Sequence, residues 1–251
     1  MYKELRNYGS DPDVWAKPLF SGRIPLIDAL RIRFISKDIR WKYIEGKLSS
    51  GAKVLDAGCG LGEWVIFMSR KGLRPIGMDY SQKLISFLES RFPKQQWKRG
   101  AVQDLPFSPG DFDAVISWGV IEHDEAGPQK AIKEFYRVLK SGGRLFLTVP
   151  IDTLAQRRSS AVIFGNLNNE GKFFQYFLTP DELKNFILQA GFEVEQILAT
   201  SRHYALVFPG LYRRLVAACP LLSRLIGLLL KPLLISNKKA LNIIFAVARK
   251  H

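Results

Sequence analysis

In the stretch VLDAGCGLGEW, three glycines directly follow an apolar run that begins near Lys53. Gly58, Gly60 and Gly62 let the backbone turn tightly after a strand and approach a ligand without side-chain obstruction. The helix expected next presents its free N–H groups to the same ligand. Asp56 ends the strand before the loop, where a carboxylate suits a ligand with a cationic amino group. The stretch therefore predicts a site for an adenosine that carries an amino acid.

The residue after the last of these glycines argues against a dinucleotide. In the dinucleotide fingerprint, the third glycine falls three residues after the second. That position is Glu63 here, so a carboxylate would lie where the pyrophosphate binds. A nicotinamide-dependent oxidoreductase remains an alternative function, and this position disfavours it.

Two more aspartates follow at the ends of predicted strands. Asp79 can accept hydrogen bonds from both hydroxyls of a ribose, and Asp104 can accept one from the exocyclic amine of an adenine. Taken alone, Asp56 could cap the following turn and Asp79 could end a strand. Asp56, Asp79 and Asp104 together occupy three successive strand ends and predict one row of ligand-binding carboxylates.

The elements that must position this row alternate in type. Short apolar runs alternate with helical stretches, which is typical of βαβ units around a mostly parallel sheet. The sequence predicts strands at 53–58, 74–80, 97–102, 112–119, 144–150, 192–200 and 241–250. It predicts helices at 62–72, 81–92, 128–143 and 179–191, the last with a complete capping box that starts at Thr179.

Five stretches carry a family resemblance. In chain order they are VLDAGCGLG, GMDYS, AVQDLPF, FDAVISWGVIEH and FYRVLKSGGRLFLTVP. They resemble the successive motifs of the class I S-adenosylmethionine-dependent methyltransferases that act on small molecules. The resemblance implies S-adenosylmethionine as cofactor. It also implies an α/β fold with a Rossmann-like, seven-stranded, mostly parallel sheet, helices on both faces and an antiparallel last strand.

The same resemblance implies roles for single residues. It places the methionine end of the cofactor against Asp56, Gly58 and Gly60, the ribose against Asp79, and the adenine against Asp104 and Leu105. It places the sulfonium near Trp118 and Gly119. The remaining cofactor-binding positions that the motifs imply are Cys59, Gly62, Tyr80 and Gln103. Cys59 also has a structural interpretation, as a small buried residue that packs under the loop.

His123 is the candidate catalytic residue. An imidazole near the end of strand 112–119 can take a proton from a substrate hydroxyl during transfer, or it can hydrogen-bond the loop backbone. Glu122 and Asp124 either hold His123 or face water. Because in-line methyl transfer depends mainly on alignment in a desolvated site, the chemistry does not require a catalytic side chain. No spacing typical of a metal site is present.

Length and composition favour a single domain. The chain has 251 residues, of which 47% are hydrophobic. We divide it into an N-terminal helical cap (1–50), a cofactor-binding core (53–150), two substrate-side insertions or lids (151–178 and 201–240) and a final strand (241–250). Only Cys59 and Cys219 could form a disulfide, and their separation instead favours a reducing, cytoplasmic compartment.

Two features of the insertions have open interpretations. The aromatic run at 173–177 either roofs a substrate pocket or belongs to the core. Arg157 and Arg158 either meet an anionic substrate or are solvated.

The net charge of +14 lies mostly at the two ends of the chain. Because the middle is close to neutral, nucleic acid is not the expected partner. Residues 211–239 combine many leucines with Arg and Lys but contain no uninterrupted apolar span of the roughly 20 residues that cross a bilayer. They either lie on an anionic membrane surface or pack on the domain as a lid, and one element can do both.

The sequence therefore predicts a methyltransferase whose substrate is a small molecule of apolar or anionic character, such as a lipid, quinone or glycan precursor. A non-catalytic, methyltransferase-like scaffold at a membrane is the alternative from another functional class.

Overall fold

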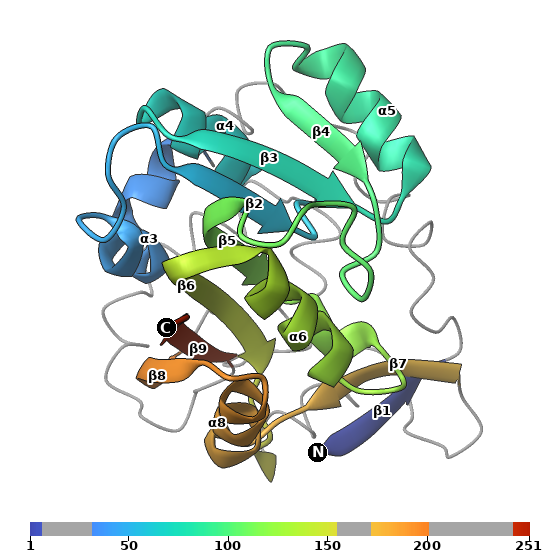
Figure 1. Ribbon diagram of the computed structural model, residues 1–251. Helices are drawn as coiled ribbons and strands as arrows, with labels where there is room; N and C mark the ends of the chain where they lie inside the picture. The colour runs from blue at the N-terminus through green and yellow to red at the C-terminus, as the bar shows by residue number, and fades with distance from the viewer. Residues whose placement is uncertain (7–31, 155–171, 201–242) are drawn as a thin grey trace, which may run out of the picture.

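The structure, a computed structural model, describes residues 1–6, 32–154, 172–200 and 243–251 and is built around a seven-stranded sheet (Figure 1). In order across the sheet, the strands are β4 (Gln96–Arg99), β3 (Arg74–Asp79), β2 (Lys53–Ala57), β5 (Phe112–Trp118), β6 (Leu139–Pro150), β9 (Ile243–Arg249) and β8 (Glu193–Thr200). Neighbouring strands from β4 to β6 are parallel, and β9 is antiparallel to both β6 and β8. The predicted fold class and the antiparallel last strand are confirmed.

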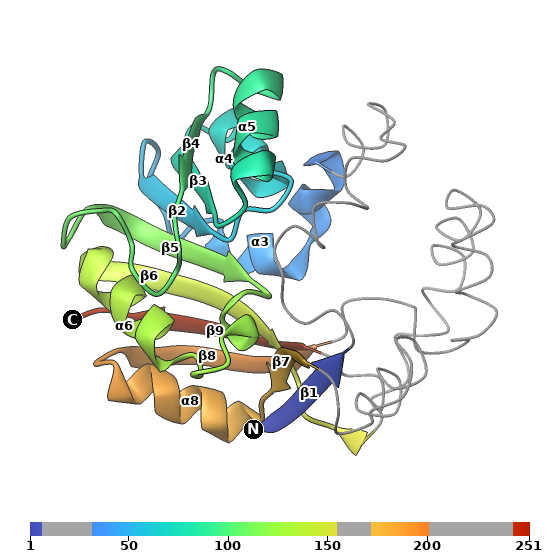
Figure 2. The same ribbon diagram turned by 90° about the vertical axis from the view of Figure 1, so that its right-hand side faces the viewer.

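Helices cover both faces of the sheet (Figure 2). One face packs against α3 (Ile39–Ile44), α4 (Glu63–Arg70) and α5 (Gln82–Arg91), and the other against α6 (Gln129–Val138) and α8 (Pro180–Gln189). Two short 3-10 helices are η1 (Ile35–Lys37) and η2 (Ile121–His123). Strand β5 shows why both faces are covered: Ala114 and Ile116 are buried on the α3–α4 side, and Val115 is buried on the α6–α8 side.

The predicted helix starts agree with the observed caps. The Ser81 hydroxyl accepts from the backbone N–H of Leu84 at 3.3 Å and begins α5. At α8, the Thr179 hydroxyl accepts from the N–H of Glu182, whose carboxylate accepts from the N–H of Thr179 at 2.9 Å. Each cap satisfies backbone donors that the first helical turn leaves without partners, so local sequence is enough to predict it.

The end of α6 differs from the prediction. The helix expected over 128–143 ends at Val138, and β6 follows directly. Lys250 contributes to this early end, because its ammonium group donates to the carbonyls of Tyr136 and Leu139 at 2.8 and 2.7 Å. Gly142, expected to cap the helix, has a φ of +77° within β6 and donates its N–H to the Lys250 carbonyl at 2.8 Å. Together with the N–H groups of Gly110 and Asp111, which donate to Arg137 and Val138, Lys250 satisfies the carbonyls at the end of the helix from segments distant in sequence.

A second, two-stranded sheet was not predicted. β1 (Tyr2–Arg6) pairs antiparallel with β7 (Lys172–Phe177), so residues 2–6 form a strand where we expected a helical cap, although α3 in the same segment is helical. β7 likewise lies in a stretch expected to be irregular. Phe174 and Phe177 are buried, and this favours the core interpretation of the aromatic run.

Several predictions concern residues that lie outside the described ranges. These are Arg157, Arg158, Cys219 and the segment 211–239, which makes up most of the insertion at 201–240.

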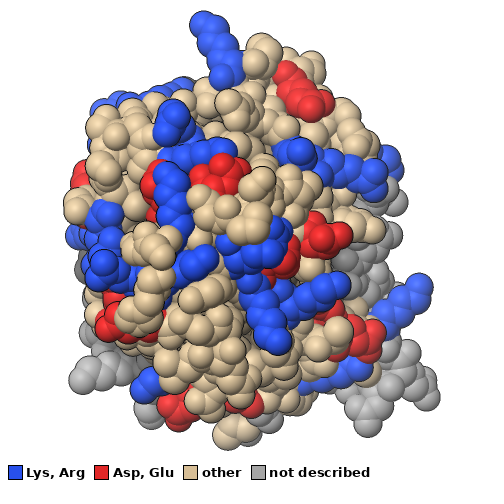
Figure 3. All heavy atoms as spheres, in the orientation of Figure 1, with Lys and Arg blue, Asp and Glu red and all other residues tan. Residues whose placement is uncertain are grey.

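Within the described ranges, no helix is long and apolar enough to cross a membrane. On the face shown in Figure 3, acidic and basic side chains are interspersed.

Candidate functional site

The glycine loop joins β2 to α4, and its three glycines have different surroundings. Gly58, Gly60 and Gly62 all have left-handed φ values, of +83°, +51° and +71°. A Cβ added at Gly58 would stand 2.3 Å from Val120, and one at Gly62 would stand 2.4 Å from Trp97. At Gly60, no atom of the described residues would lie within 4 Å. Packing therefore explains the outer two glycines, whereas Gly60 faces open space that a ligand could occupy.

Asp79 holds the loop against the end of β3. Its carboxylate accepts from the backbone N–H of Gly60 at 3.1 Å and from that of Ser81 at 3.0 Å. Burial raises the pKa of Asp79, and these backbone hydrogen bonds act in the opposite direction. Each carboxylate oxygen keeps acceptor capacity, so Asp79 can both hold the loop and bind ligand hydroxyls.

Asp56 is a buried carboxylate without a hydrogen-bond partner in the described chain. Asp56 is 1% exposed, and neither of its carboxylate oxygens receives a hydrogen bond within the described chain. Burial, with a further contribution from Asp79, raises the pKa of Asp56 to about 8, and Arg40 opposes this shift. Buried carboxylates are normally paired, so the position fits a cationic ligand group that would complete it.

Arg40 supplies the opposite charge and was not predicted. Its guanidinium carbon lies 4.9 Å from the ring centres of both Trp64 and Trp118. Two of its nitrogens donate to Asp38, at 2.9 and 2.6 Å, whereas the third, Nη1, is buried without a partner in the described residues. No motif spacing indicates this residue, because the packing of α3 on the sheet brings it to the site.

The turn after β4 carries the residues expected at the adenine. Ala101 and Asp104 form an isolated bridge, and the Asp104 side chain is exposed. Leu105 is buried, and its N–H donates to Glu134 at 2.8 Å. The Gln103 amide donates to Asp124 at 2.9 Å and so connects this turn to the loop after η2. Tyr80, at the end of β3, is 57% exposed.

Trp118 and Gly119 lie where β5 ends. The Trp118 ring packs against Trp64 and Phe245, at ring-centre distances of 5.1 and 6.2 Å. Gly119 has a φ of +72° and donates its N–H to the Thr148 carbonyl at 3.0 Å. The chain thus turns away from the sheet at the same end as the glycine loop, as in open α/β sheets that bind ligands at the carboxyl ends of their strands.

His123 is fixed by β7. Its Nδ1 lies 2.8 Å from the Phe174 carbonyl, and the two rings pack edge to face at 5.2 Å. A carbonyl oxygen can only accept, so Nδ1 carries the proton and Nε2 keeps the basic lone pair. The backbone contact predicted as the structural alternative is present, and it also leaves the imidazole in a form that can accept a proton.

Cys59 behaves as a packing residue in its surroundings. Its thiol is buried beside the loop, and burial raises its pKa well above the usual range, with further contributions from Asp56 and Asp79. A thiol held protonated in this way is a poor nucleophile. In the described ranges, no group of three or more His, Cys, Asp or Glu side chains is placed to hold a metal ion.

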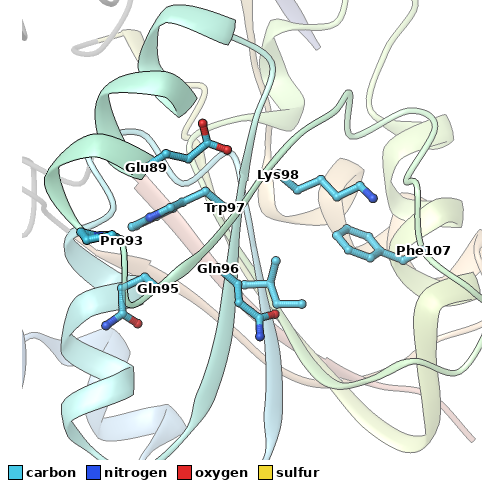
Figure 4. A pocket seen from close by; sticks show the side chains of 8 residues that line it. Glu89, Pro93, Gln95, Gln96, Trp97, Lys98 and Phe107 are labelled. Atoms are coloured by element: carbon cyan, nitrogen blue, oxygen red, sulfur yellow. The ribbon is translucent and has the colours of Figure 1, made fainter.

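A surface hollow of about 550 Å³ lies apart from these residues (Figure 4). Pro93, Gln95 and Gln96 line it, together with Trp97, Lys98 and Phe107. The hollow lies along β4, and none of Asp56, Asp79 and Asp104 lines it.

Comparisons with known proteins agree with this geometry. The methyltransferase domain family matches residues 29–197. A protein of Mycolicibacterium smegmatis named as a probable S-adenosylmethionine-dependent methyltransferase is 28% identical over 184 residues, which are 68% of this chain and 67% of that protein. A ubiquinone biosynthesis O-methyltransferase of Dechloromonas aromatica is 27% identical over 209 residues, which are 80% of this chain and 84% of that protein.

A solved S-adenosylmethionine-dependent methyltransferase of Methanosarcina mazei shares the fold, with a TM-score of 0.60 and 18% identity over 83% of this chain and 96% of that one. Two other curated relatives are matched over 46% and 45% of their length, so this chain spans about half of each. The match of the family over residues 29–197, most of the described core, identifies the chain as a member of the S-adenosylmethionine-dependent methyltransferase family.

Proposed function

We propose that this protein transfers the methyl group of S-adenosylmethionine to a hydroxyl group of a small aromatic molecule of the quinone-precursor type. The observation that carries the proposal is a buried acidic and a buried basic side chain, each with unpartnered polar atoms, at the carboxyl end of the sheet. Asp56 has two unpartnered oxygens, and Arg40 has one unpartnered nitrogen. An amino acid group carries an ammonium and a carboxylate close together and would satisfy both residues.

Other residues would hold the rest of the cofactor. Asp79 accepts from the ribose hydroxyls, next to the open space at Gly60. Asp104 and Leu105 flank the adenine, and Tyr80 and Gln103 complete this end. The bound cofactor supplies a methyl group on a positively charged sulfur. The backbone at Trp118 and Gly119 would lie near that group and would limit the access of water and the direction from which an acceptor approaches.

His123 would take the proton of the acceptor hydroxyl. The Phe174 carbonyl holds its Nδ1–H, so Nε2 is the basic nitrogen. This is the tautomer that general-base catalysis requires, and such a base typically contributes about 10²–10⁴-fold to a rate. Gln103 and Asp124 link the loop of His123 to the adenine side of the site and would keep the base near the cofactor.

The acceptor class is inferred from relatives. The relative from Dechloromonas aromatica is named an O-methyltransferase of ubiquinone biosynthesis, and a relative from Lactiplantibacillus plantarum is named a demethylmenaquinone methyltransferase. Lipid and glycan precursors are the other acceptors that the sequence suggested. Incubating the protein with labelled S-adenosylmethionine and a short-chain prenylated catechol tests the proposal, and the expected result is a methylated catechol.

The variants His123→Gln and Asp79→Ala make this assay specific. His123→Gln should lose methylation and keep cofactor binding, whereas Asp79→Ala should lose cofactor binding. If the wild type binds S-adenosylhomocysteine but methylates neither the catechol nor any component of a lipid, quinone and glycan extract, the non-catalytic scaffold is favoured. If the protein binds NAD but does not bind S-adenosylhomocysteine, the oxidoreductase is favoured.

Residues 211–239 would bring the enzyme to an anionic membrane surface from the cytoplasm. Their leucines alternate with basic residues, and each Arg or Lys near such a surface contributes about 1 kcal/mol. Nucleic acid is not an expected partner. Co-sedimentation with anionic vesicles at low salt tests the membrane proposal. Changing Arg213, Arg214, Lys238 and Lys239 to Glu should abolish the binding, and unchanged sedimentation would instead favour a lid that packs on the domain.

A further inference from the structure

Two more polar groups near the site are buried without a hydrogen-bond partner in the described chain. They are the indole Nε1 of Trp118 and the hydroxyl of Thr148. Thr148 is 3% exposed, and both side chains come from strands of the central sheet. A buried donor that makes no hydrogen bond destabilises the folded protein, so native structures rarely keep one without a reason.

The two groups lie side by side. Trp118 and Thr148 are direct partners in the parallel pairing of β5 with β6, and such strands are about 4.8 Å apart. Two residues earlier on each strand, Ile116 and Phe146 are buried against the α3–α4 side of the sheet. Because strand side chains alternate between faces, Trp118 and Thr148 point to that same side, at the carboxyl ends seen together in Figure 2.

Arg40 and Asp56 are already assigned to the amino acid end of the cofactor, so these two donors are available to a second ligand. Trp118 lies on β5, the strand next to Asp56 on β2, and Thr148 is one strand further out. The arrangement extends the site beyond the cofactor, towards the part of the sheet end where an acceptor must approach the methyl group.

The chemistry of the two groups narrows the ligand. An indole N–H can only donate, so the ligand atom that it meets must be an acceptor. Neither group is charged, and the nearby cation, Arg40, is already assigned to the carboxylate of the cofactor. A buried anion would therefore lack a compensating charge. The rings of Trp118 and Phe245, 6.2 Å apart, supply an aromatic wall beside the donors.

We propose that Trp118 Nε1 and the Thr148 hydroxyl bind an uncharged oxygen on an aromatic ring of the methyl acceptor, a second hydroxyl or carbonyl next to the one that is methylated. The proposal rests on the proposed function and specifies its substrate: an aromatic ring with at least two neighbouring oxygens. A ring with a single hydroxyl would leave both donors unpaired and would bind less well.

Nuclear magnetic resonance of the full-length protein labelled with ¹⁵N at its five tryptophans tests the subsite directly. Trp118→Phe assigns the Trp118 indole resonance. In protein saturated with S-adenosylhomocysteine, catechol should shift that resonance, whereas phenol and benzoate should shift it much less. Thr148→Val, which keeps the shape but removes the hydroxyl, should weaken catechol binding about three- to tenfold and leave S-adenosylhomocysteine binding unchanged.

Two tryptophans serve as internal controls. Trp97 Nε1 already donates to the Phe92 carbonyl at 3.1 Å, and its resonance should stay in place. Trp41 Nε1 is buried without a partner in the described chain, but its ring packs on Phe67 in α4, away from the strand ends. A shift of Trp118 alone therefore reports the subsite and not burial in general.

Three results would overturn the proposal. The first is a Trp118 resonance that shifts with S-adenosylhomocysteine and not with catechol, together with weaker S-adenosylhomocysteine binding in Thr148→Val, because the donors would then belong to the cofactor. The second is a preference for benzoate over catechol. The third is no shift with catechol in the saturated protein. Failure of the proposed function is separate, since it would appear either as no binding of S-adenosylhomocysteine or as binding without methylation of any acceptor.

Discussion

Lowering the pH from ~7.5 to ~5.5 should weaken the binding of S-adenosylhomocysteine about a hundredfold, because Asp56 must lose a proton to pair with the ligand's ammonium group. This ligand keeps the amino acid end of the cofactor and lacks the reactive methyl group. The pKa of Asp56 is raised to about 8, first by burial and then by Asp79, and Arg40 opposes the shift. In the ligand-free protein the carboxyl group is therefore mostly protonated at neutral pH.

The sign and the magnitude follow from that pKa. Below pH 8 the ionised fraction of Asp56 falls tenfold per pH unit, which costs about 1.4 kcal/mol of binding free energy per unit. Affinity should therefore rise with pH over this range, in which the ligand's amino group stays protonated. At pH 7 about nine molecules in ten must release a proton on binding.

Isothermal titration calorimetry measures both quantities. Repeating the titration at pH 7 in two buffers of different ionisation enthalpy gives the number of protons released. Asp56→Asn keeps the shape of the side chain but has no carboxyl group, so it should bind weakly and lose the pH dependence. A flat profile in the wild type would refute the role of Asp56. A slope that survives in Asp56→Asn would assign the titration to Asp79, whose pKa is also raised.

Three further predictions concern substitutions of residues at the site. Gly60→Ala should weaken S-adenosylhomocysteine binding, whereas Gly62→Ala should lower the melting temperature more. Both variants share a left-handed backbone strain of about 1–2 kcal/mol, but only Gly62→Ala would also place a Cβ 2.4 Å from Trp97. Equal melting temperatures of the two variants would contradict this explanation. Arg40→Lys keeps the charge but loses the two-point contact with Asp38, so calorimetry should show binding at least about tenfold weaker. His123→Gln should lower kcat on a catechol by about 10²-fold or more with little change in cofactor affinity, and an unchanged kcat would restrict His123 to its contact with Phe174.

The parts of the fold that sequence predicted are those set by local interactions. Ser81 and Thr179 start helices through hydrogen bonds within four residues, and β2 with its loop is specified by an apolar run followed by glycines. Each signal and its structural effect lie within one short segment. The predicted order of elements from residue 53 to residue 150 was therefore correct, apart from the ends of single helices and strands.

The parts that sequence reasoning missed depend on contacts between distant segments. β1 pairs with β7 more than 160 residues later, and neither strand has a turn signal that indicates its partner. Lys250, at the other end of the chain, contacts the last turn of α6. Arg40 reaches the site only because α3 packs beside α4. The local pattern of each segment contains no information on which distant segment will contact it.

The glycine motif illustrates why spacing predicted a ligand but only part of its chemistry. Val120 and Trp97 leave no room for a side chain at Gly58 and Gly62, so two of the three glycines report packing within the protein and not contact with a ligand. What distinguishes an amino acid ligand from a diphosphate is charge. Asp56 offers a phosphate no positive charge, and its desolvated carboxyl needs a cation to ionise. Arg40 then accommodates the carboxylate that accompanies this cation, so the two residues together select the zwitterion that neither would select alone.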